Sequence, residues 1–344
     1  MTESPPLLVV ENLVTEFRIR GRWWPAVRNV SFTLARDETL ALVGESGCGK
    51  SVTALSLTRL VPNPPGRIVA GSVVFDGVDL LKLSDDGMRK LRGKEIGFIF
   101  QDPLTSLNPT LTIGYQIAEA IRQHMGLSKK ASVDRVVELL GKVGIPRARD
   151  RLNDYPHQFS GGMRQRAMIA MALSLDPEVL IADEPTTALD VTVQAQILDL
   201  IERLQDEFGT AIIMITHDLG VVADIADDVL VMYGGKPVEV ADRRTAYYNP
   251  HMPYTWGLLQ SLPAIGAEHT GEQLRPIKGL PPSLINLPKG CSFNPRCPYV
   301  MEVCTRVEPE LEPADPAKPS HLSACHLSLE DKERIWQQEV APTR

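Results

Sequence analysis

One glycine-rich segment constrains the fold of this chain more than any other feature. It follows the strand-like run Thr39–Val43 and precedes the helix-compatible stretch Val52–Leu60. Glycines let backbone N–H groups face phosphate groups, lysine adds charge to them, and serine offers a hydroxyl to Mg²⁺. The segment therefore predicts a nucleotide site between a strand and a helix, built by Gly44, Glu45, Ser46, Gly47, Cys48, Gly49, Lys50 and Ser51.

A second glycine segment, Ser160-Gly161-Gly162, lies more than a hundred residues further on and opens another helix-compatible stretch. A turn of this kind offers free backbone N–H groups and the positive end of a helix dipole, which suits a phosphate. One active site rarely needs two such cradles. The simplest hypothesis is that each serves a different nucleotide, in a dimer that ATP closes.

Acidic and polar residues follow the predicted strands of the same region. The buried-strand run Val179–Ala182 ends in Asp183 and Glu184, while Gln101 and His217 each follow another strand-like run. Strands alternating with helices predict a largely parallel α/β sheet, whose carboxyl edge holds ligands. We expect Asp183 to assist Mg²⁺ binding and Glu184 to polarise the attacking water. Gln101 is expected to contact Mg²⁺ or that water, and His217 the γ-phosphate.

Composition narrows the class of protein. The chain has 344 residues, of which 43% are hydrophobic and 23% charged, as in an ordinary folded protein. Its net charge of −7 argues against a surface that coats nucleic acid. No apolar run is long enough to span a bilayer, and the N-terminus lacks the pattern of a signal peptide. A soluble, cytoplasmic protein is expected.

From about Asn249 prolines become frequent and long periodic segments disappear, which predicts a loop-rich extension. The extension contains Cys291, Cys297, Cys304 and Cys325, separated by five, six and twenty residues. In a reducing compartment such a cluster favours a metal site over disulfides. The spacing is not that of a zinc ribbon, so an iron–sulfur cluster of the [4Fe–4S] type is the first hypothesis, with zinc second and unligated thiols third. His321 and His326 flank Cys325. They are expected to be solvated surface residues, and the alternative is that they support the metal ligands.

Taken in order, the phosphate loop, Gln101, the Ser160 segment, the acidic strand and His217 resemble the sequence motifs of ATP-binding-cassette (ABC) ATPases. The run Ala188-Leu189-Asp190 resembles the further dimer-contact motif of that family, which implies a nucleotide-site role for Asp190. The resemblance also implies a head-to-tail dimer with two ATP molecules between the subunits. Met163 stands where the family signature has glutamine, which puts a role for that side chain in doubt.

The adenine base is expected to stack on an aromatic side chain near the first strands. Phe17 fits the family position, with Trp23 and Trp24 as alternatives.

Longer segments resemble one branch of the family, the oligopeptide and dipeptide importers. They are Gln101–Pro109, Pro156–Arg166, Asn249–Thr255 and Gly290–Pro298. The resemblance implies an ABC ATPase domain over residues 1–248, with an antiparallel β subdomain and a helical subdomain at about 102–165, and an extension over 249–344. It also implies a second homologous ATPase, a heterodimer being favoured, two membrane permease subunits, an extracytoplasmic peptide-binding protein, and a location at the cytoplasmic face of the membrane.

Two other functions compete with peptide import. One is a soluble ABC ATPase that acts on nucleic acid or ribosomes, and the other is an importer of a different solute, such as a nickel chelate or glutathione. A single cassette and the acidic net charge disfavour the first. A nucleotide sensor without enzymatic activity would be expected to lack Lys50 or Glu184, and both are present.

Overall fold

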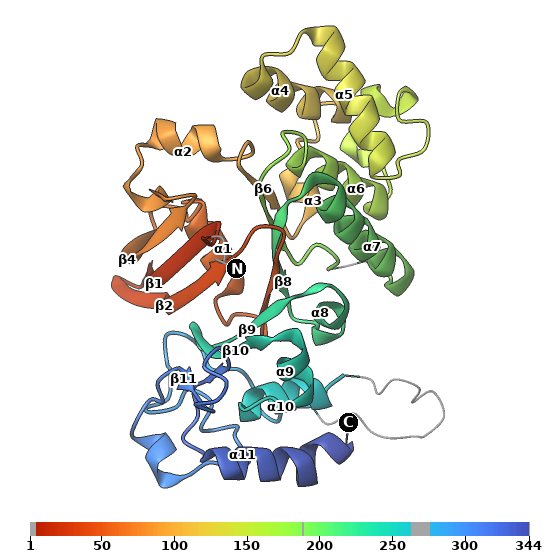
Figure 1. Cartoon of the computed structure of the whole chain (residues 1–344). Helices are drawn as coiled ribbons and strands as arrows, with labels where there is room; N and C mark the ends of the chain where they lie inside the picture. The colour runs from red at the N-terminus through yellow and green to blue at the C-terminus, as the bar shows by residue number, and fades with distance from the viewer. Residues whose placement is uncertain (1–4, 188, 263–275, 344) are drawn as a thin grey trace. The chain divides into compact units, whose positions relative to one another are not determined.

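The computed structural model describes residues 5–187, 189–262 and 276–343 (Figure 1). The chain divides into two compact units. The first unit contains residues 34–38 and 79–215, and the second contains 8–33, 39–78 and the described part of 216–344. Among the described helices, none is long and apolar enough to cross a membrane.

The first unit is built on parallel strands. Strand β6 (Ile96–Ile99) pairs with β7 (Val179–Asp183), and β7 pairs with β8 (Ala211–Thr216). Every residue of β7 and β8 is buried, as expected of strands covered on both faces. The parallel α/β arrangement predicted from the sequence is therefore confirmed within this unit.

Helices occupy most of the rest of the first unit. Thr112 and Gly126 cap the ends of α4, and α5 buries an apolar face that includes Val136, Leu139 and Leu140. The long α7 ends at Gly209, whose φ of 61° suits glycine. The helices of this unit are α2 (Asp85–Leu91), α3 (Pro103–Ser106), α4 (Ile113–Met125), α5 (Lys129–Lys142), α6 (Gly161–Ala172) and α7 (Val191–Phe208), with short 3₁₀ turns at Leu80–Lys82, Asp150–Asn153 and Pro156–Gln158.

The second unit begins with the predicted antiparallel sheet, which is confirmed (Figure 1). Its strand order is β2-β1-β4-β5, with bounds Arg22–Leu34, Leu8–Ile19, Gly66–Phe75 and Val78–Asp79. Strands β1 and β4 pair from Leu8 opposite Phe75 to Phe17 opposite Gly66. Alternating buried and exposed side chains along β2 indicate that one face of this sheet packs on the core.

A second sheet of this unit carries the phosphate loop. Strand β3 (Thr39–Val43) is parallel to β9 (Asp228–Tyr233), and β10 (Lys236–Asp242) runs antiparallel to β9. The short strands β12 (Leu322–Ser323) and β11 (Glu312–Pro313) continue the sheet beyond β10. The helices nearest in sequence are α1 (Lys50–Leu57), α8 (Leu219–Ile225) and α9 (Arg243–Tyr248).

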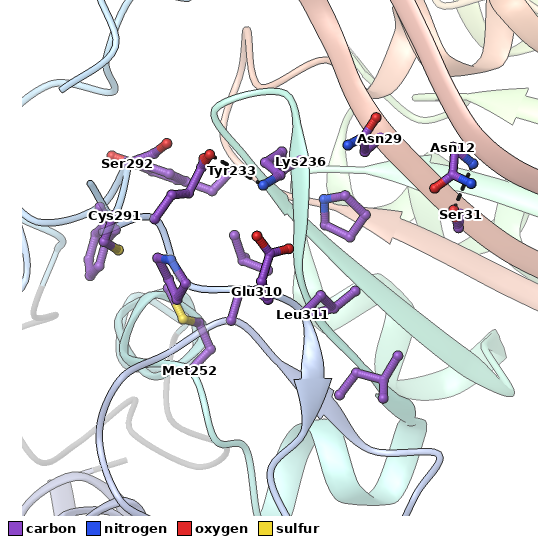
Figure 2. Close-up of a pocket in the computed structure, with 17 residues that line it drawn as sticks. Asn12, Asn29, Ser31, Tyr233, Lys236, Met252, Cys291, Ser292, Glu310 and Leu311 are labelled. Carbon is purple, nitrogen blue, oxygen red and sulfur yellow. Dashed lines mark hydrogen bonds and ion pairs between the residues drawn. The ribbon is translucent and has the colours of Figure 1, made fainter. Parts of the chain in front are cut away.

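The extension shares the core of the second unit. Trp256, Phe293 and Trp336 are buried in one hydrophobic cluster with Val43 and Tyr233, so they pack on β3 and β9. Figure 2 shows Cys291 and Ser292 beside Tyr233 at a cavity of about 310 Å³ in the same region. The extension is therefore loop-rich, as predicted, and buried residues in its described part belong to the core of the second unit. It contains α10 (Pro253–Gln260), a 3₁₀ turn (Glu302–Thr305), α11 (Leu329–Ile335), a π-helical turn (Trp336–Val340) and a last 3₁₀ turn (Ala341–Thr343).

Candidate nucleotide site

The phosphate loop joins β3 to α1, and its conformation requires glycine. Gly44, Gly47 and Gly49 have φ angles of 149°, 80° and 109°, which side chains rarely allow. A Cβ at Gly44 would lie 2.3 Å from the Met232 carbonyl oxygen, and one at Gly49 would lie 2.6 Å from the Ala26 carbonyl oxygen. No side chain caps the first turn of α1 at Gly49, which leaves its N–H groups for an anion.

Lys50 folds over this loop. Its side chain is 4% exposed, and its Nζ donates to the carbonyl oxygens of Gly44 at 2.7 Å and Glu45 at 3.2 Å. Cys48 is buried beside it, and burial raises the pKa of its thiol, so Cys48 stays neutral. The positive charge of Lys50 therefore lies inside the curve of the loop backbone.

The extension also holds the phosphate loop, through two residues that the sequence did not reveal as part of the site. The backbone N–H of Glu45 donates to the Tyr254 hydroxyl at 2.8 Å. Two nitrogens of Arg296 donate to the two Glu45 carboxylate oxygens at 2.5 and 2.8 Å. Arg296 directly precedes Cys297 in a loop-rich segment, and no local pattern pairs it with Glu45.

In the first unit, Gln101 and Glu184, both assigned to the site from the sequence, are in direct contact. Gln101 Nε2 donates to Glu184 Oε2 at 2.9 Å, and Thr187 Oγ1 donates to the same oxygen at 2.9 Å. Asp183, the last residue of β7, is 6% exposed. Thr187 was missed because a threonine three residues after a glutamate carries no recognisable signal.

The backbone at Glu184 is strained. Its φ is 47°, a left-handed value uncommon outside glycine, asparagine and aspartate, and its N–H donates to the Ile215 carbonyl oxygen at 2.9 Å. Such a conformation costs on the order of 1–3 kcal/mol and is retained where the surroundings enforce it, as at active sites. The strain and both side-chain donors hold the Glu184 carboxylate in one orientation.

Ser160 caps α6, where its Oγ accepts from the Met163 N–H at 3.3 Å. Gly161 and Gly162 are the first two residues of α6, so helix geometry gives their N–H groups no intrahelical acceptor. A Cβ at Gly162 would lie 3.1 Å from Val193, whereas one at Gly161 would meet only Leu189, at 4.0 Å. Within the described part of the chain, packing around Gly161 therefore leaves room for a larger residue.

The remaining site residues predicted from the sequence lie in or next to different helices and strands. Asp190 caps α7 by accepting from the Val193 N–H at 3.0 Å. His217 is exposed and directly follows β8. Phe17 lies in β1, half-buried, opposite Gly66. Trp23 has the Arg67 guanidinium over its ring at 3.8 Å, which covers one of its faces.

The four cysteines of the extension line one small cavity of about 20 Å³. Burial, with a contribution from the neighbouring thiols, raises the pKa of Cys291 to about 11 and that of Cys297 to about 12. Among the described residues, no group of three or more His, Cys, Asp or Glu side chains has the arrangement of a metal site. The structure thus brings the four cysteines together at one cavity, but the described residues do not show the arrangement of the predicted metal site there.

The expectation of a solvated His321 was wrong. His321 is 2% exposed, its Nε2 lies 2.9 Å from Oε1 of the buried Glu239, and its ring stacks on His251 at 4.2 Å between centroids. Burial lowers the pKa of His251 to about 3, so that ring is neutral. His326 Nε2 lies 3.0 Å from the Val307 carbonyl oxygen. The error arose because the sequence does not show that β10 and β12 enclose this segment.

Comparison with known proteins agrees with this geometry. Residues 27–187 match the model of the ABC transporter family, and residues 238–304 match that of the oligopeptide/dipeptide transporter C-terminal region. The dipeptide transport ATP-binding protein DppD of Bacillus subtilis is 53% identical over 303 residues, which cover 88% of this chain and 90% of that protein. The chain belongs to the ATP-binding subunits of the oligopeptide/dipeptide ABC transporters.

Another relative matches this chain over a similarly large share of its length. The oligopeptide transport ATP-binding protein OppD of Escherichia coli is 49% identical over 329 residues, or 96% of this chain and 95% of its own length. Among solved structures, the ATP-binding cassette MJ0796, a dimer bound to ADP and Pi, has 27% identity and a TM-score of 0.62 over 69% of this chain and 99% of its own. The cassette fold is therefore common to this chain and to a cassette that holds nucleotide.

Proposed function

We propose that this chain is the ATP-binding and ATP-hydrolysing subunit of an importer for oligopeptides or dipeptides. The observation that carries the proposal is a direct contact between the phosphate loop and the C-terminal extension of the same chain. A glycine-dependent phosphate loop with a folded-over Lys50 is bonded, through Glu45, to an extension of the peptide-transporter type. Relatives named for dipeptide and oligopeptide transport match nearly the whole chain.

The roles follow from the chemistry of each side chain. Lys50 and the loop N–H groups bind the β- and γ-phosphates, and Phe17 stacks on adenine. Ser51, Gln101 and Asp183 supply the hydroxyl, amide and carboxylate oxygens that Mg²⁺ prefers, and the ion would neutralise phosphate charge. Glu184 takes a proton from the attacking water, with its carboxylate held by Gln101 and Thr187.

The second phosphate cradle points to a dimer. Gly161 is open on its outer side, and the neighbouring Val191 is 84% exposed beside Asp190, as expected of a surface that a second ATPase covers. Ser160, Gly161 and Gly162 would then contact ATP held by the partner. The partner is a homologous subunit, in a heterodimer rather than a homodimer.

Two permease subunits and an extracytoplasmic binding protein complete the assembly, at the cytoplasmic face of the membrane. Leu104, in the helix that follows Gln101, is 62% exposed and suits an apolar contact with a permease. Residues 1–248 form the ATPase domain, with helices at about 102–165, and residues 249–344 form the extension. Import of another solute is the second candidate, because selection of the solute is expected to reside in the binding protein and the permeases.

Uptake of labelled peptides tests the proposal. Deleting the gene from its source cell, in a strain without other peptide importers, is expected to abolish uptake of labelled di- to pentapeptides. Restoring the wild-type gene is expected to restore uptake, and membranes are expected to yield the chain together with two permeases. Normal peptide uptake combined with lost uptake of nickel or glutathione would favour the second candidate instead.

We further propose that the extension carries a [4Fe–4S] cluster, with zinc as the alternative. The support is the convergence of Cys291, Cys297, Cys304 and Cys325 on one cavity, since four thiols are a soft donor set. Such a group would crosslink the segments of a loop-rich region, a structural role. ATP-driven import requires no electron transfer, so no redox step is assigned to it.

Metal analysis of anaerobically purified chain separates these hypotheses. We expect brown protein with broad visible absorption and about four iron and four sulfide per chain. Replacing Cys297 with serine is expected to remove the iron and the colour, whereas Cys48→Ser, at a residue that does not line that cavity, is expected to leave both unchanged. One zinc per chain without iron would establish the alternative, and absence of both metals would mean that the thiols are unligated.

A further inference from the structure

The phosphate loop contains an acidic side chain that calls for a counter-charge. Glu45 follows the first glycine of the loop, and its carboxylate is 24% exposed. A carboxylate there would repel the triphosphate that the loop is proposed to bind. Like charges a few ångströms apart near a protein surface repel by on the order of 1–4 kcal/mol, which corresponds to about ten-fold or more in affinity.

Arg296 supplies that counter-charge from the extension. Its guanidinium forms two parallel bonds with the Glu45 carboxylate, and its side chain is only 5% exposed. Parallel pairing fixes direction as well as charge. The hydrogen bond from Arg296 to the Tyr233 hydroxyl, at 3.3 Å, and the bond from Arg296 Nε to the Lys278 carbonyl oxygen, at 3.1 Å, hold the guanidinium in place.

The same loop residue is fixed a second time through its backbone. The Tyr254 hydroxyl, which accepts from the Glu45 N–H, belongs to a ring with no exposed surface. Glu45 in turn offers its carbonyl oxygen to Lys50 Nζ at 3.2 Å. A chain of direct contacts therefore runs from Arg296, through Glu45, to the lysine assigned to the phosphates.

We propose that Arg296 is a positioning residue of the ATP site, which neutralises Glu45 and holds it away from the bound triphosphate. This inference rests on the proposed ATP-binding role of the loop. It gives the extension a function in nucleotide binding, beyond any metal that the cysteines hold. The ion pair between Arg28 and Glu308, at 2.9 Å, links β2 to the extension without touching Glu45 and serves as the comparison.

The proposal is tested by measuring how tightly the full-length chain and its variants bind trinitrophenyl-ATP with Mg²⁺. The variants remove first the charge of Arg296 and then the charge of Glu45 as well. Arg296→Gln is expected to weaken nucleotide binding about ten-fold, since an uncompensated carboxylate remains in the loop. Adding Glu45→Gln to that variant is expected to restore most of the affinity, because the repulsion is removed. Glu308→Gln is expected to bind as the wild type does.

Two further measurements keep the test decisive. Thermal unfolding checks that each variant is folded, and Arg296→Lys, which keeps the charge but loses the parallel bonds, is expected to bind with intermediate affinity. Unchanged binding by Arg296→Gln, or a double variant as weak as the single one, would refute the inference. Failure of the wild-type chain to bind nucleotide at all would instead refute the proposed function.

Discussion

Replacing Glu184 with glutamine is expected to reduce ATP hydrolysis by about 10²- to 10⁴-fold while leaving ATP binding intact. The amide keeps the size of the side chain but cannot accept a proton from the attacking water. Gln101 and Thr187 both donate to Glu184 Oε2, and an amide oxygen can still accept those two bonds, so the local structure is expected to persist. Release of phosphate from saturating Mg·ATP, compared with binding of a fluorescent nucleotide, measures the two effects separately.

A second result is expected from the same variant. When hydrolysis is blocked and ATP still binds, the closed dimer accumulates, which gel filtration with and without ATP detects. Glu178→Gln provides the matched control, because Glu178 precedes the same strand and pairs with Arg36 in the same unit. The control is expected to hydrolyse ATP normally. Near-normal hydrolysis by the Glu184 variant would show that another group activates the water.

Replacing Lys50 with alanine is expected to weaken ATP binding by at least about 10²-fold and to stop peptide uptake. Lys50 Nζ contacts the carbonyl oxygens of Gly44 and Glu45, so the structure holds its charge within the loop. Removal of that charge leaves the loop N–H dipoles and Mg²⁺ to bind the phosphates. Nucleotide titration of the purified chain and uptake of labelled peptide by cells measure the two consequences.

Lys82 offers the control for this variant, because its side chain is 83% exposed and pairs only locally with Asp79. Lys82→Ala is expected to bind ATP and support uptake as the wild type does. If the Lys50 variant failed to bind ATP yet transported peptide at the normal rate, the partner ATPase alone would drive the cycle. Normal ATP binding would remove Lys50 from the site.

Much of the fold and site was predictable because local patterns carried it. The strands β3 and β7 were located within one residue, since continuous apolar runs ending in polar residues are characteristic of buried parallel strands. The order of the motifs along the chain indicated the family, because each motif is a short run of residue types. Strand β1 contains no such run, because polar residues alternate with apolar ones after Val10 in a strand with one solvated face.

The contacts between distant segments could not be predicted in the same way. The burial of His321 against Glu239 depends on the pairing of β10 with β12, which lie about eighty residues apart in the sequence. Thr187 became visible as a donor to Glu184 only when the backbone after β7 was known. These contacts depend on tertiary packing, for which the sequence contains no short-range signal.

The sequence by itself determined the chemistry: a phosphate loop, a carboxylate pair at the end of a strand, a second glycine cradle and a cysteine-rich extension. Those features are local, because each depends on residue types at fixed spacing. Only the tertiary structure decided that the extension shares the core of β3 and β9 and that Arg296 meets Glu45 across 251 residues of chain. Burial of apolar surface brings such segments together irrespective of their separation in sequence, and the charge pairing follows from that packing.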